Sequence, residues 1–182
     1  MSEKYKFRNL EGIYFVTCTV VFWIDLFTRK EYKHILINAI EYYQTKRGLN
    51  VHAYCIMPSH LHLIISSQNG ESLSAILRDF KKLTNRRLIE EVNLINESRR
   101  EWLMRAFKRA GKELKRITGY KLWQDGNHPI ELTINEMIQQ KLDYIHQNPV
   151  EAEIVDEPEY YWYSSARDYA GSKGLLSINL LT

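Results

Sequence analysis

Three stretches of the chain have the residue pattern of β-strands. Gly12 to Phe22 is rich in β-branched and aromatic residues, which favour an extended backbone. Val51 to Met57 and Leu61 to Ser67 are two further apolar runs, separated by Pro58 and Ser59. Because proline and serine favour turns, we expect these two runs to pair as a β-hairpin.

The first helical stretch lies between these strands. Thr28 is predicted to cap a helix from about Arg29 to Lys46, and Glu31, three residues after the threonine, completes a capping box. Gly48 is predicted to end this helix, because glycine readily adopts the left-handed conformation found after helix C-termini.

Two later helices show similar signals. Ser72 is predicted to cap a helix whose apolar residues recur at helical spacing: Leu73, Ile76, Leu77, Phe80, Leu83 and Leu88. Thr133, with Glu136 three residues later, is predicted to open the last clear helix. We expect that helix to stop at Asn148, because Pro149 disfavours the α conformation of the residue before it.

The order of these elements predicts the fold class. Residues 94 to 120 are expected to form a basic insertion, helical from Glu101 to Arg116, and Tyr120 to Trp123 is a candidate short strand. The order β-α-β-β-α then predicts an α+β protein with a ferredoxin-like antiparallel sheet and helices on one face. We expect residues 1–182 to form a single domain, with the insertion at about 94–120.

Composition narrows the class of protein. The chain is 45% hydrophobic and 26% charged, as in ordinary globular proteins, and its longest apolar stretch is too short to span a bilayer. The first residues lack the apolar run of a secretion signal, so we expect a cytoplasmic protein. Cys18 and Cys55 lie among apolar residues and are interpreted as reduced core cysteines, which argues against a zinc site.

Positive charge is concentrated in one segment. Between Arg78 and Lys121 there are fourteen Lys or Arg and six acidic residues, a net charge of +8 in a chain whose total is +3. Such an excess suits binding to a phosphate backbone, although a solvated helix face is an equally good interpretation of a charge run alone. The candidate DNA contacts are Arg78, Lys81, Lys82, Arg86, Arg87, Arg105, Lys108 and Arg109.

His60 and His62 are the candidate metal ligands. One apolar residue separates them, and alternate side chains of a strand point to the same side, so both imidazoles should face one point in space. Two such nitrogens supply half of a metal coordination sphere. Taken alone, the pair fits two hydrogen-bonded or exposed histidines better than a ligand pair.

A second motif changes that balance. The run Met57-Pro58-Ser59-His60-Leu61-His62-Leu63, together with the run from Leu142 to Val150 that contains Tyr144-Ile145-His146-Gln147-Asn148-Pro149, resembles the single-tyrosine HUH transposases. The resemblance is nearest to the branch called REP-associated tyrosine transposases. The aromatic segment from Tyr160 to Ser165 resembles that branch too. The likeness is weakest in the basic insertion.

This resemblance implies an activity and a site. It implies the HUH endonuclease architecture and the cleavage and rejoining of single-stranded DNA, including REP-like hairpins, through a 5′-phosphotyrosine. Tyr144 would be the nucleophile, and His60, His62 and Asn148 would bind Mg²⁺ or Mn²⁺. A phenol with a pKa of about 10 is a poor nucleophile at neutral pH, so nearby positive charge must assist its attack. His146 points elsewhere around the helix. The same resemblance implies a bacterial, nucleoid-associated protein when DNA is bound.

Several alternatives stay open from the sequence. Tyr120 competes as the nucleophile, and Asn148 could be a plain helix terminus. Trp102 and Phe107 fit packing better than base stacking. The chain could act as a monomer or a homodimer. A domesticated DNA-binding protein without cleavage activity is the main alternative function, and a metal-dependent hydrolase that uses water as its nucleophile is a third.

Overall fold

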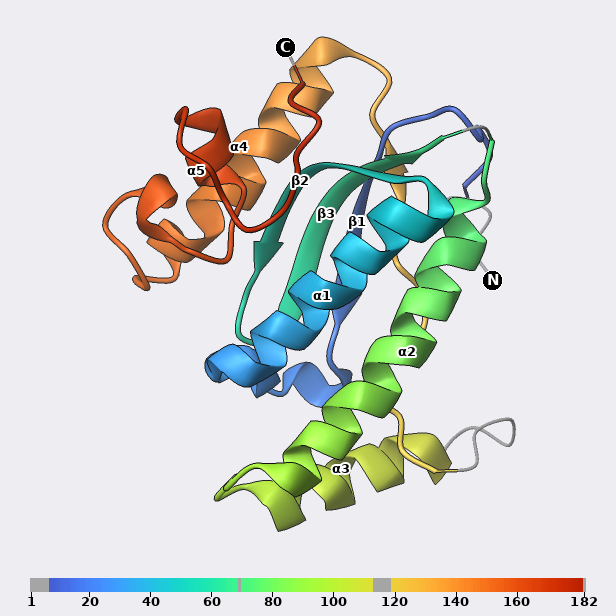
Figure 1. Ribbon diagram of the computed structural model, residues 1–182, viewed down its shortest axis with the longest axis vertical. Coiled ribbons are helices and arrows are strands. Elements are labelled where there is room, and N and C mark those ends of the chain that lie inside the picture. Colours follow the sequence, from blue (N-terminus) through green and yellow to red (C-terminus); the bar gives the residue numbers. More distant parts are fainter. Residues whose placement is uncertain (1–6, 69, 113–118, 182) are drawn as a thin grey trace.

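A four-stranded antiparallel sheet forms the centre of the molecule (Figure 1). The computed structural model describes residues 7–68, 70–112 and 119–181. The strand order is β2-β3-β1-β4, which places β3 between β2 and β1. The strands are β1 (Tyr14–Thr19), β2 (Leu49–Ile56), β3 (His60–Ser67) and β4 (Ile130–Glu131). The predicted α+β class with an antiparallel sheet is confirmed.

Helices and short 3-10 turns connect and cover the strands. The helices are α1 (Lys30–Arg47), α2 (Leu73–Leu94), α3 (Arg100–Lys112), α4 (Asn135–Glu151) and the short α5 (Ala166–Tyr169). The 3-10 turns span Val21–Trp23, Leu26–Thr28 and Pro158–Tyr160. Within the described ranges, none of the helices has the length and apolar character needed to cross a membrane.

Two apolar cores lie on opposite faces of the sheet. The larger core contains Val16 and Leu63 and is covered by α1 and α2 (Figure 1). The smaller one contains Phe15, Ile64 and Ile145, and α4 packs on this face against β2 and β3. The prediction of helices on one face only is therefore wrong. The apolar side of α4 must be buried against something, and the second face of the sheet provides that surface.

Local signals in the sequence correctly located several element ends. β2 and β3 form the expected hairpin, in which Met57 N donates to the His60 carbonyl at 2.8 Å. The Ser72 hydroxyl accepts a hydrogen bond from Ala75 N at 3.3 Å and so caps α2. Gly48 adopts φ +60° after α1, a left-handed conformation that suits glycine.

The predicted capping box at Thr28 is wrong. Helix α1 begins at Lys30, with an extended Arg29 as its N-cap, and Thr28 belongs to the 3-10 turn before it. The Thr28 hydroxyl instead accepts a hydrogen bond from the Arg99 guanidinium at 3.4 Å. A tertiary contact with the start of α3 therefore replaces the local cap.

The short strand predicted at Tyr120 to Trp123 is also absent from the described residues, which show only an isolated bridge between Val20 and Trp123 there. The side chain of Asn85 on α2 accounts for the difference. Its amide donates to the Tyr120 carbonyl at 3.1 Å and accepts from Leu122 N at 2.8 Å. These backbone groups are thus satisfied by a side chain rather than by a second strand.

Three other boundaries differ from the prediction. Helix α4 begins at Asn135, after Ile134 rather than Thr133, and continues through Pro149 to Glu151. A proline in the last turn removes a single intrahelical hydrogen bond, so the helix tolerates it there. Strand β1 ends at Thr19, before the predicted Phe22. Helix α3 begins at Arg100, close to the prediction, and the predicted continuation over residues 113–116 lies outside the described residues.

Candidate active site

The two histidines lie on the face of the sheet that α4 covers. In the antiparallel register of β1 and β3, His60 is opposite Thr19 and His62 is opposite Thr17. The centroids of the two imidazole rings are 4.5 Å apart. The alternation of side chains along β3 therefore brings both rings to one place, with Leu61 between them in the larger core on the other face.

Hydroxyl groups orient both imidazole rings. His62 Nδ1 lies 3.0 Å from Thr17 Oγ1, and His60 Nδ1 lies 3.1 Å from Ser59 Oγ. His62 Nε2 is buried and has no hydrogen-bond partner among the described residues. A buried ring nitrogen without a partner is costly, and a metal ion would satisfy it. Ligating histidines commonly hold their second nitrogen in this way, so the pair fits a metal site.

Burial also sets the protonation of the pair. Desolvation lowers the pKa of His60 to about 4. Desolvation, followed by the positive charges of His60 and Lys141, lowers the pKa of His62 to about 3. Both imidazoles are therefore neutral near pH 7, and the neutral form is the one that binds a metal ion.

Tyr144 on α4 lies against the histidines. Its ring centroid is 5.2 Å from that of His62 and 6.0 Å from that of Phe15, which stacks on His62 at 5.5 Å. The Tyr144 side chain is 43% exposed and can therefore be reached from solvent. Lys141, one turn earlier, places its ammonium 5.3 Å from the Tyr144 ring centroid and 4.9 Å from that of Phe15. A phenol, a cation and two imidazoles thus meet at one site.

Tyr120, the competing nucleophile, lies elsewhere. Its backbone is bonded to Asn85 of α2, and α2 covers the face of the sheet opposite the histidines. Together with Arg78, Lys81 and Lys82 it lines a shallow surface hollow of ≈ 330 Å³. The fold therefore brings Tyr144, rather than Tyr120, to the histidine pair.

Asn148 and His146 occupy other positions on α4. The Asn148 amide nitrogen donates to the Tyr144 carbonyl at 2.6 Å, and the described contacts do not bring this side chain to either histidine. His146 Nε2 lies 2.9 Å from Ser165 Oγ, and its ring is next to Tyr169. Among the described residues, no group of three or more His, Cys, Asp or Glu is placed to hold a metal ion. A third ligand must therefore come from another residue type or from the substrate.

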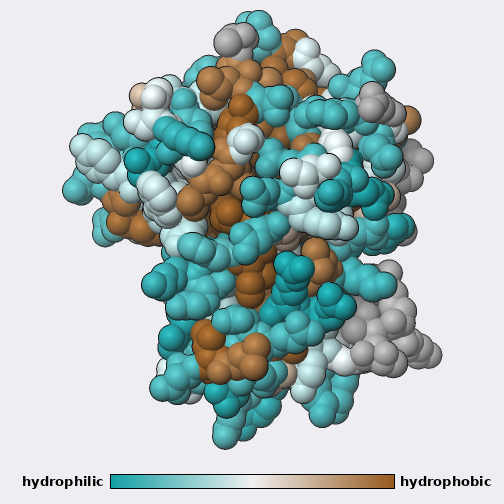
Figure 2. All heavy atoms as spheres, in the orientation of Figure 1, coloured by the Kyte–Doolittle hydropathy of each residue, from teal (hydrophilic) through white to brown (hydrophobic). Residues whose placement is uncertain are grey.

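The candidate DNA contacts are divided between two helices. On α2, Arg78 pairs with Asp79, Arg86 pairs with Glu90 at 3.9 Å, and Lys81 Nζ donates to backbone carbonyls. On α3, a hollow of ≈ 540 Å³ is lined by Arg105, Lys108, Arg109 and Lys112. Figure 2 shows that hydrophilic side chains predominate over α2 and α3, with some hydrophobic residues between them. Part of the positive charge on α2 therefore has a structural role, whereas Lys82 and Arg87 on α2 are exposed, as are Arg105, Lys108 and Arg109 on α3.

Sequence reasoning missed several residues of this site. Thr17 and Ser59 orient the two imidazoles, Phe15 packs against both His62 and Tyr144, and Lys141 supplies the nearby charge. Lys141 could have been found from its spacing, because residues three apart on a helix are neighbours on one face. Thr17 could not, because its role depends on the register between β1 and β3.

Comparisons with known proteins find similarity to transposases. Residues 23–108 match the family model described as transposase IS200 like, a segment that contains both histidines and ends before α4. A solved structure of a REP-associated tyrosine transposase bound to a REP hairpin is 20% identical, with a TM-score of 0.67, over 100% of this chain and 94% of that chain. A putative transposase from Deinococcus radiodurans R1 is 15% identical, with a TM-score of 0.44, over 81% of this chain and 95% of that chain. No curated protein matches the chain.

Proposed function

We propose that this chain cleaves and rejoins single-stranded DNA through a 5′-phosphotyrosine formed at Tyr144. The match of residues 23–108 to the family model described as transposase IS200 like supports this proposal. The observation that supports this most directly is the 5.2 Å separation between the ring centroids of Tyr144 and His62. Both residues belong to the same chain, and the protein is proposed to act as a monomer or a homodimer. We take residues 1–182 as a single functional domain.

The two histidines are proposed as metal ligands. His60 and His62 would hold Mg²⁺ or Mn²⁺ through their Nε2 atoms, while Nδ1–H of each ring donates to the hydroxyl of Ser59 or Thr17. Asn148 is proposed as a third ligand through its amide oxygen, since its nitrogen is already bonded to the Tyr144 carbonyl. A bound ion would supply positive charge that polarises the scissile phosphate. Mixed nitrogen and oxygen ligation favours manganese.

The remaining chemistry is assigned to residues of the chain. The Tyr144 oxygen attacks phosphorus and loses its proton to solvent, the bond between phosphorus and the 3′ oxygen breaks, and the released oxygen takes up a proton to become a hydroxyl. The Lys141 ammonium, 5.3 Å from the Tyr144 ring centroid, stabilises the negative charge of the phenolate and of the phosphate. Attack of a 3′-hydroxyl on the phosphotyrosine reverses these steps and rejoins a strand. The covalent bond preserves the phosphodiester energy, so no nucleotide cofactor is needed.

The proposed partner is single-stranded or hairpin DNA. The solved transposase of the same fold is bound to a REP hairpin, and the basic residues of α2 and α3 would contact the phosphates of a similar hairpin here. Arg105, Lys108 and Arg109 are the leading contacts, because they line one hollow on α3. Arg78, Lys81, Lys82, Arg86 and Arg87 on α2 complete the candidate surface. Binding through phosphates should weaken as salt rises.

A covalent-adduct assay tests the proposal. Incubation with Mn²⁺ and an end-labelled hairpin oligonucleotide that has single-stranded flanks should give a protein–DNA adduct stable to denaturation. Tyr144→Phe should abolish the adduct, since it removes the attacking oxygen and retains the ring that packs on Phe15 and His62. Tyr120→Phe is the matched control, an equally small change at the competing tyrosine, and should leave the adduct unchanged.

Other outcomes separate the alternatives. An undiminished adduct in Tyr144→Phe would overturn the assignment of the nucleophile. Free cleaved ends without an adduct would indicate water as the nucleophile and a metal-dependent hydrolase. Salt-sensitive binding by the unmodified protein, with neither adduct nor cleavage, would indicate a DNA-binding protein without cleavage activity.

A further inference from the structure

An open cleft lies between the turn after β1 and helix α3, beside the histidine pair. It has a volume of ≈ 500 Å³, and its lining includes Phe22, Trp23, Trp102, Arg105 and Arg109. Phe22, Trp23 and Trp102 are 50%, 62% and 49% exposed. Three large aromatic side chains that share one open cleft leave an unusually apolar surface in contact with water, which is typical of a binding site.

The backbone holds two of these rings outward at a cost. Phe22 has φ +58° and Trp23 has φ +56°, in the left-handed region that bulky residues rarely adopt. Backbone strain of this kind persists where the surroundings impose it, and it is concentrated at functional sites. Here Trp23 N donates to the Val20 carbonyl at 3.1 Å, and Val20 N donates to the Ser59 carbonyl at 2.9 Å. The turn is thereby tied to the residue that orients His60.

The cleft adjoins the proposed site of cleavage. The Trp23 ring meets the His60 ring edge-on, with centroids 5.6 Å apart. A DNA strand with a phosphate at the histidine pair would therefore carry its next nucleotide over Trp23 and into the cleft. This step of the argument rests on the proposed function, whereas the chemistry of the cleft itself does not.

The charge of the cleft favours a nucleotide. Arg105 and Arg109 lie on its α3 side, and the Arg109 guanidinium is 5.7 Å from the centroid of the Phe22 ring. The basic hollow formed by Lys108 and Lys112 with the same two arginines continues from it. The one acidic residue of the lining, Asp25, is paired with Arg99 at 2.7 Å. Aromatic faces next to guanidinium groups suit an unpaired base and its phosphate.

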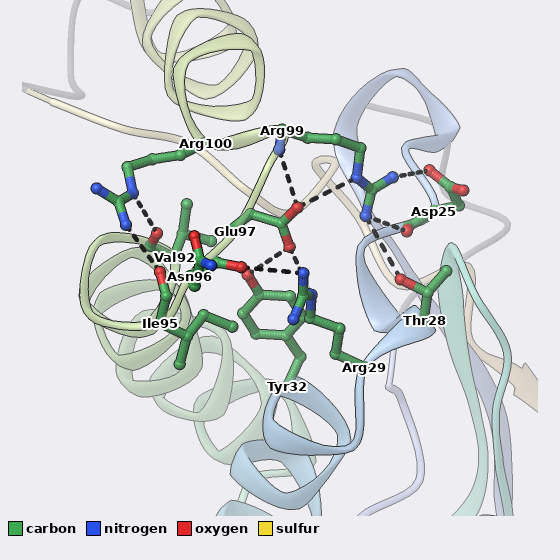
Figure 3. A network of polar contacts seen from close by, with 10 residues as sticks. All are labelled: Asp25, Thr28, Arg29, Tyr32, Val92, Ile95, Asn96, Glu97, Arg99 and Arg100. Carbon is green, nitrogen blue, oxygen red and sulfur yellow. Dashed lines mark hydrogen bonds and ion pairs between the residues drawn. The ribbon is translucent and has the colours of Figure 1, made fainter.

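A polar network fixes the two walls of the cleft to each other (Figure 3). The Arg99 guanidinium bonds Asp25 and Thr28, and the buried carboxylate of Glu97 accepts from Arg99 N at 3.0 Å. The same carboxylate also pairs with Arg29 at 3.1 Å. Since these contacts join the start of α3 to the segment before α1, the cleft is formed before a ligand arrives.

We propose that this cleft binds the unpaired base of a DNA nucleotide adjacent to the cleaved phosphate, by stacking it on Trp102 and Phe22 next to Arg109. Base stacking on aromatic rings tolerates any sequence, because every base has a π face. The cleft would thus hold single-stranded DNA at a fixed register while the hairpin is recognised elsewhere.

The test couples a change in the protein to a change in the DNA. A labelled hairpin with a single-stranded flank is compared with a series in which one flanking base at a time is replaced by an abasic site. Fluorescence anisotropy without metal gives the affinities. Wild-type protein should lose affinity, roughly 5- to 100-fold, at one abasic position. Trp102→Ala should weaken binding to the intact flank by a similar factor and show no further loss at that position.

Matched controls separate stacking from a general defect. Trp162 is 44% exposed and has the Arg167 guanidinium 4.4 Å from its ring centroid, but it belongs to the segment after α4. Trp162→Ala should leave the full abasic profile unchanged. Trp102→Phe should keep most of the affinity. Equal thermal unfolding midpoints of the variants would show that the folded structure is retained, as expected for a half-exposed side chain.

The outcomes distinguish this inference from the proposed function. Independent losses from Trp102→Ala and from the abasic site, or none from Trp102→Ala, would overturn the inference even if Tyr144 forms the adduct. If the cleft instead binds a side chain of a partner protein, Trp102→Ala should cause no loss of DNA affinity. Coupled losses in a protein that forms no adduct would support the base-binding cleft and refute the cleavage chemistry.

Discussion

The buried carboxylate of Glu97 offers a sharp test of how the fold is held together (Figure 3). Glu97 lies between α2 and α3 and is almost fully buried. Its oxygens accept from the Tyr32 hydroxyl at 3.0 Å and from Arg99 N at 3.0 Å, and they pair with Arg29 at 3.1 Å. We predict that Glu97→Ala substantially lowers the free energy of unfolding.

The size of the loss in unfolding free energy depends on which partners of Glu97 lose a hydrogen bond or an ion pair. The Tyr32 hydroxyl is fully buried and would be left without its acceptor, which costs about 1 to 3 kcal/mol. Arg29 and Arg99 are partly exposed, so water replaces much of what they lose and each ion pair adds at most about 1 kcal/mol. Arg99 also keeps its pair with Asp25. The expected total is about 1 to 5 kcal/mol.

Urea unfolding monitored by circular dichroism provides the measurement, with the midpoint shifted and the slope unchanged. Glu90→Ala is the matched control, because Glu90 pairs with Arg86 at 3.9 Å and both side chains are exposed. That variant should change the free energy of unfolding by less than about 0.5 kcal/mol. Equal losses in the two variants would refute the reasoning from burial.

The same carboxylate predicts a dependence on pH. Burial alone would raise the pKa of Glu97, but hydrogen bonds from Arg99 N and Tyr32 and the charges of Arg29 and Arg99 outweigh it, so the pKa is lowered. A carboxyl group whose pKa is lower in the folded state stabilises the protein above its unfolded pKa. That contribution is lost as the pH falls through the folded value. The difference between wild type and Glu97→Ala should therefore persist at neutral pH and shrink in acid.

Two further predictions concern other buried groups. Burial lowers the pKa of His146 to about 4, so between about pH 6.5 and pH 4 the unfolded chain takes up a proton that the folded protein does not. Acidification from pH 7 to pH 5 should consequently destabilise wild type by about 1 to 2 kcal/mol more than His146→Gln in urea unfolding, and identical pH profiles would contradict this. Thr17→Val removes the hydroxyl 3.0 Å from His62 Nδ1 and should weaken Mn²⁺ binding by about 10- to 100-fold in calorimetric titration. Thr45→Val, a change on α1, serves as its control, and an equal effect of both would refute the orienting role of Thr17.

The sequence predicted those parts of the fold that depend on local signals. The β2–β3 hairpin, the Ser72 cap and the Gly48 helix end were all predicted, because each is determined by residues within a few positions. The capping box at Thr28 failed because Arg99, far along the chain, takes its hydroxyl. The short strand at Tyr120 to Trp123 failed because Asn85 satisfies its backbone. Tertiary contacts overrode local preference in both cases.

The candidate site could also be predicted in part from the sequence. Period-two alternation predicted that His60 and His62 share a face, and their ring centroids are 4.5 Å apart. Residues 23–108, which include the histidine motif, match the transposase IS200 like family model, and the fold resembles that of a solved REP-associated tyrosine transposase. The roles of Tyr144, His60, His62 and Asn148 stay predictions. Phe107 is buried, as expected for packing, whereas Trp102 is half-exposed and lines the cleft. Its partner Trp23 had no sequence signal, because its position depends on an unusual backbone conformation.

The two apolar cores have different consequences for the molecule. The larger core, under α1 and α2, contains most of the buried side chains and therefore accounts for most of the resistance to unfolding. The smaller core, with Phe15, Leu142 and Ile145, seats α4 and with it Tyr144. Substitutions in the smaller core should therefore act on the placement of the tyrosine more directly than those in the larger core, although the two layers share strands β1 and β3 and the partly buried Tyr163.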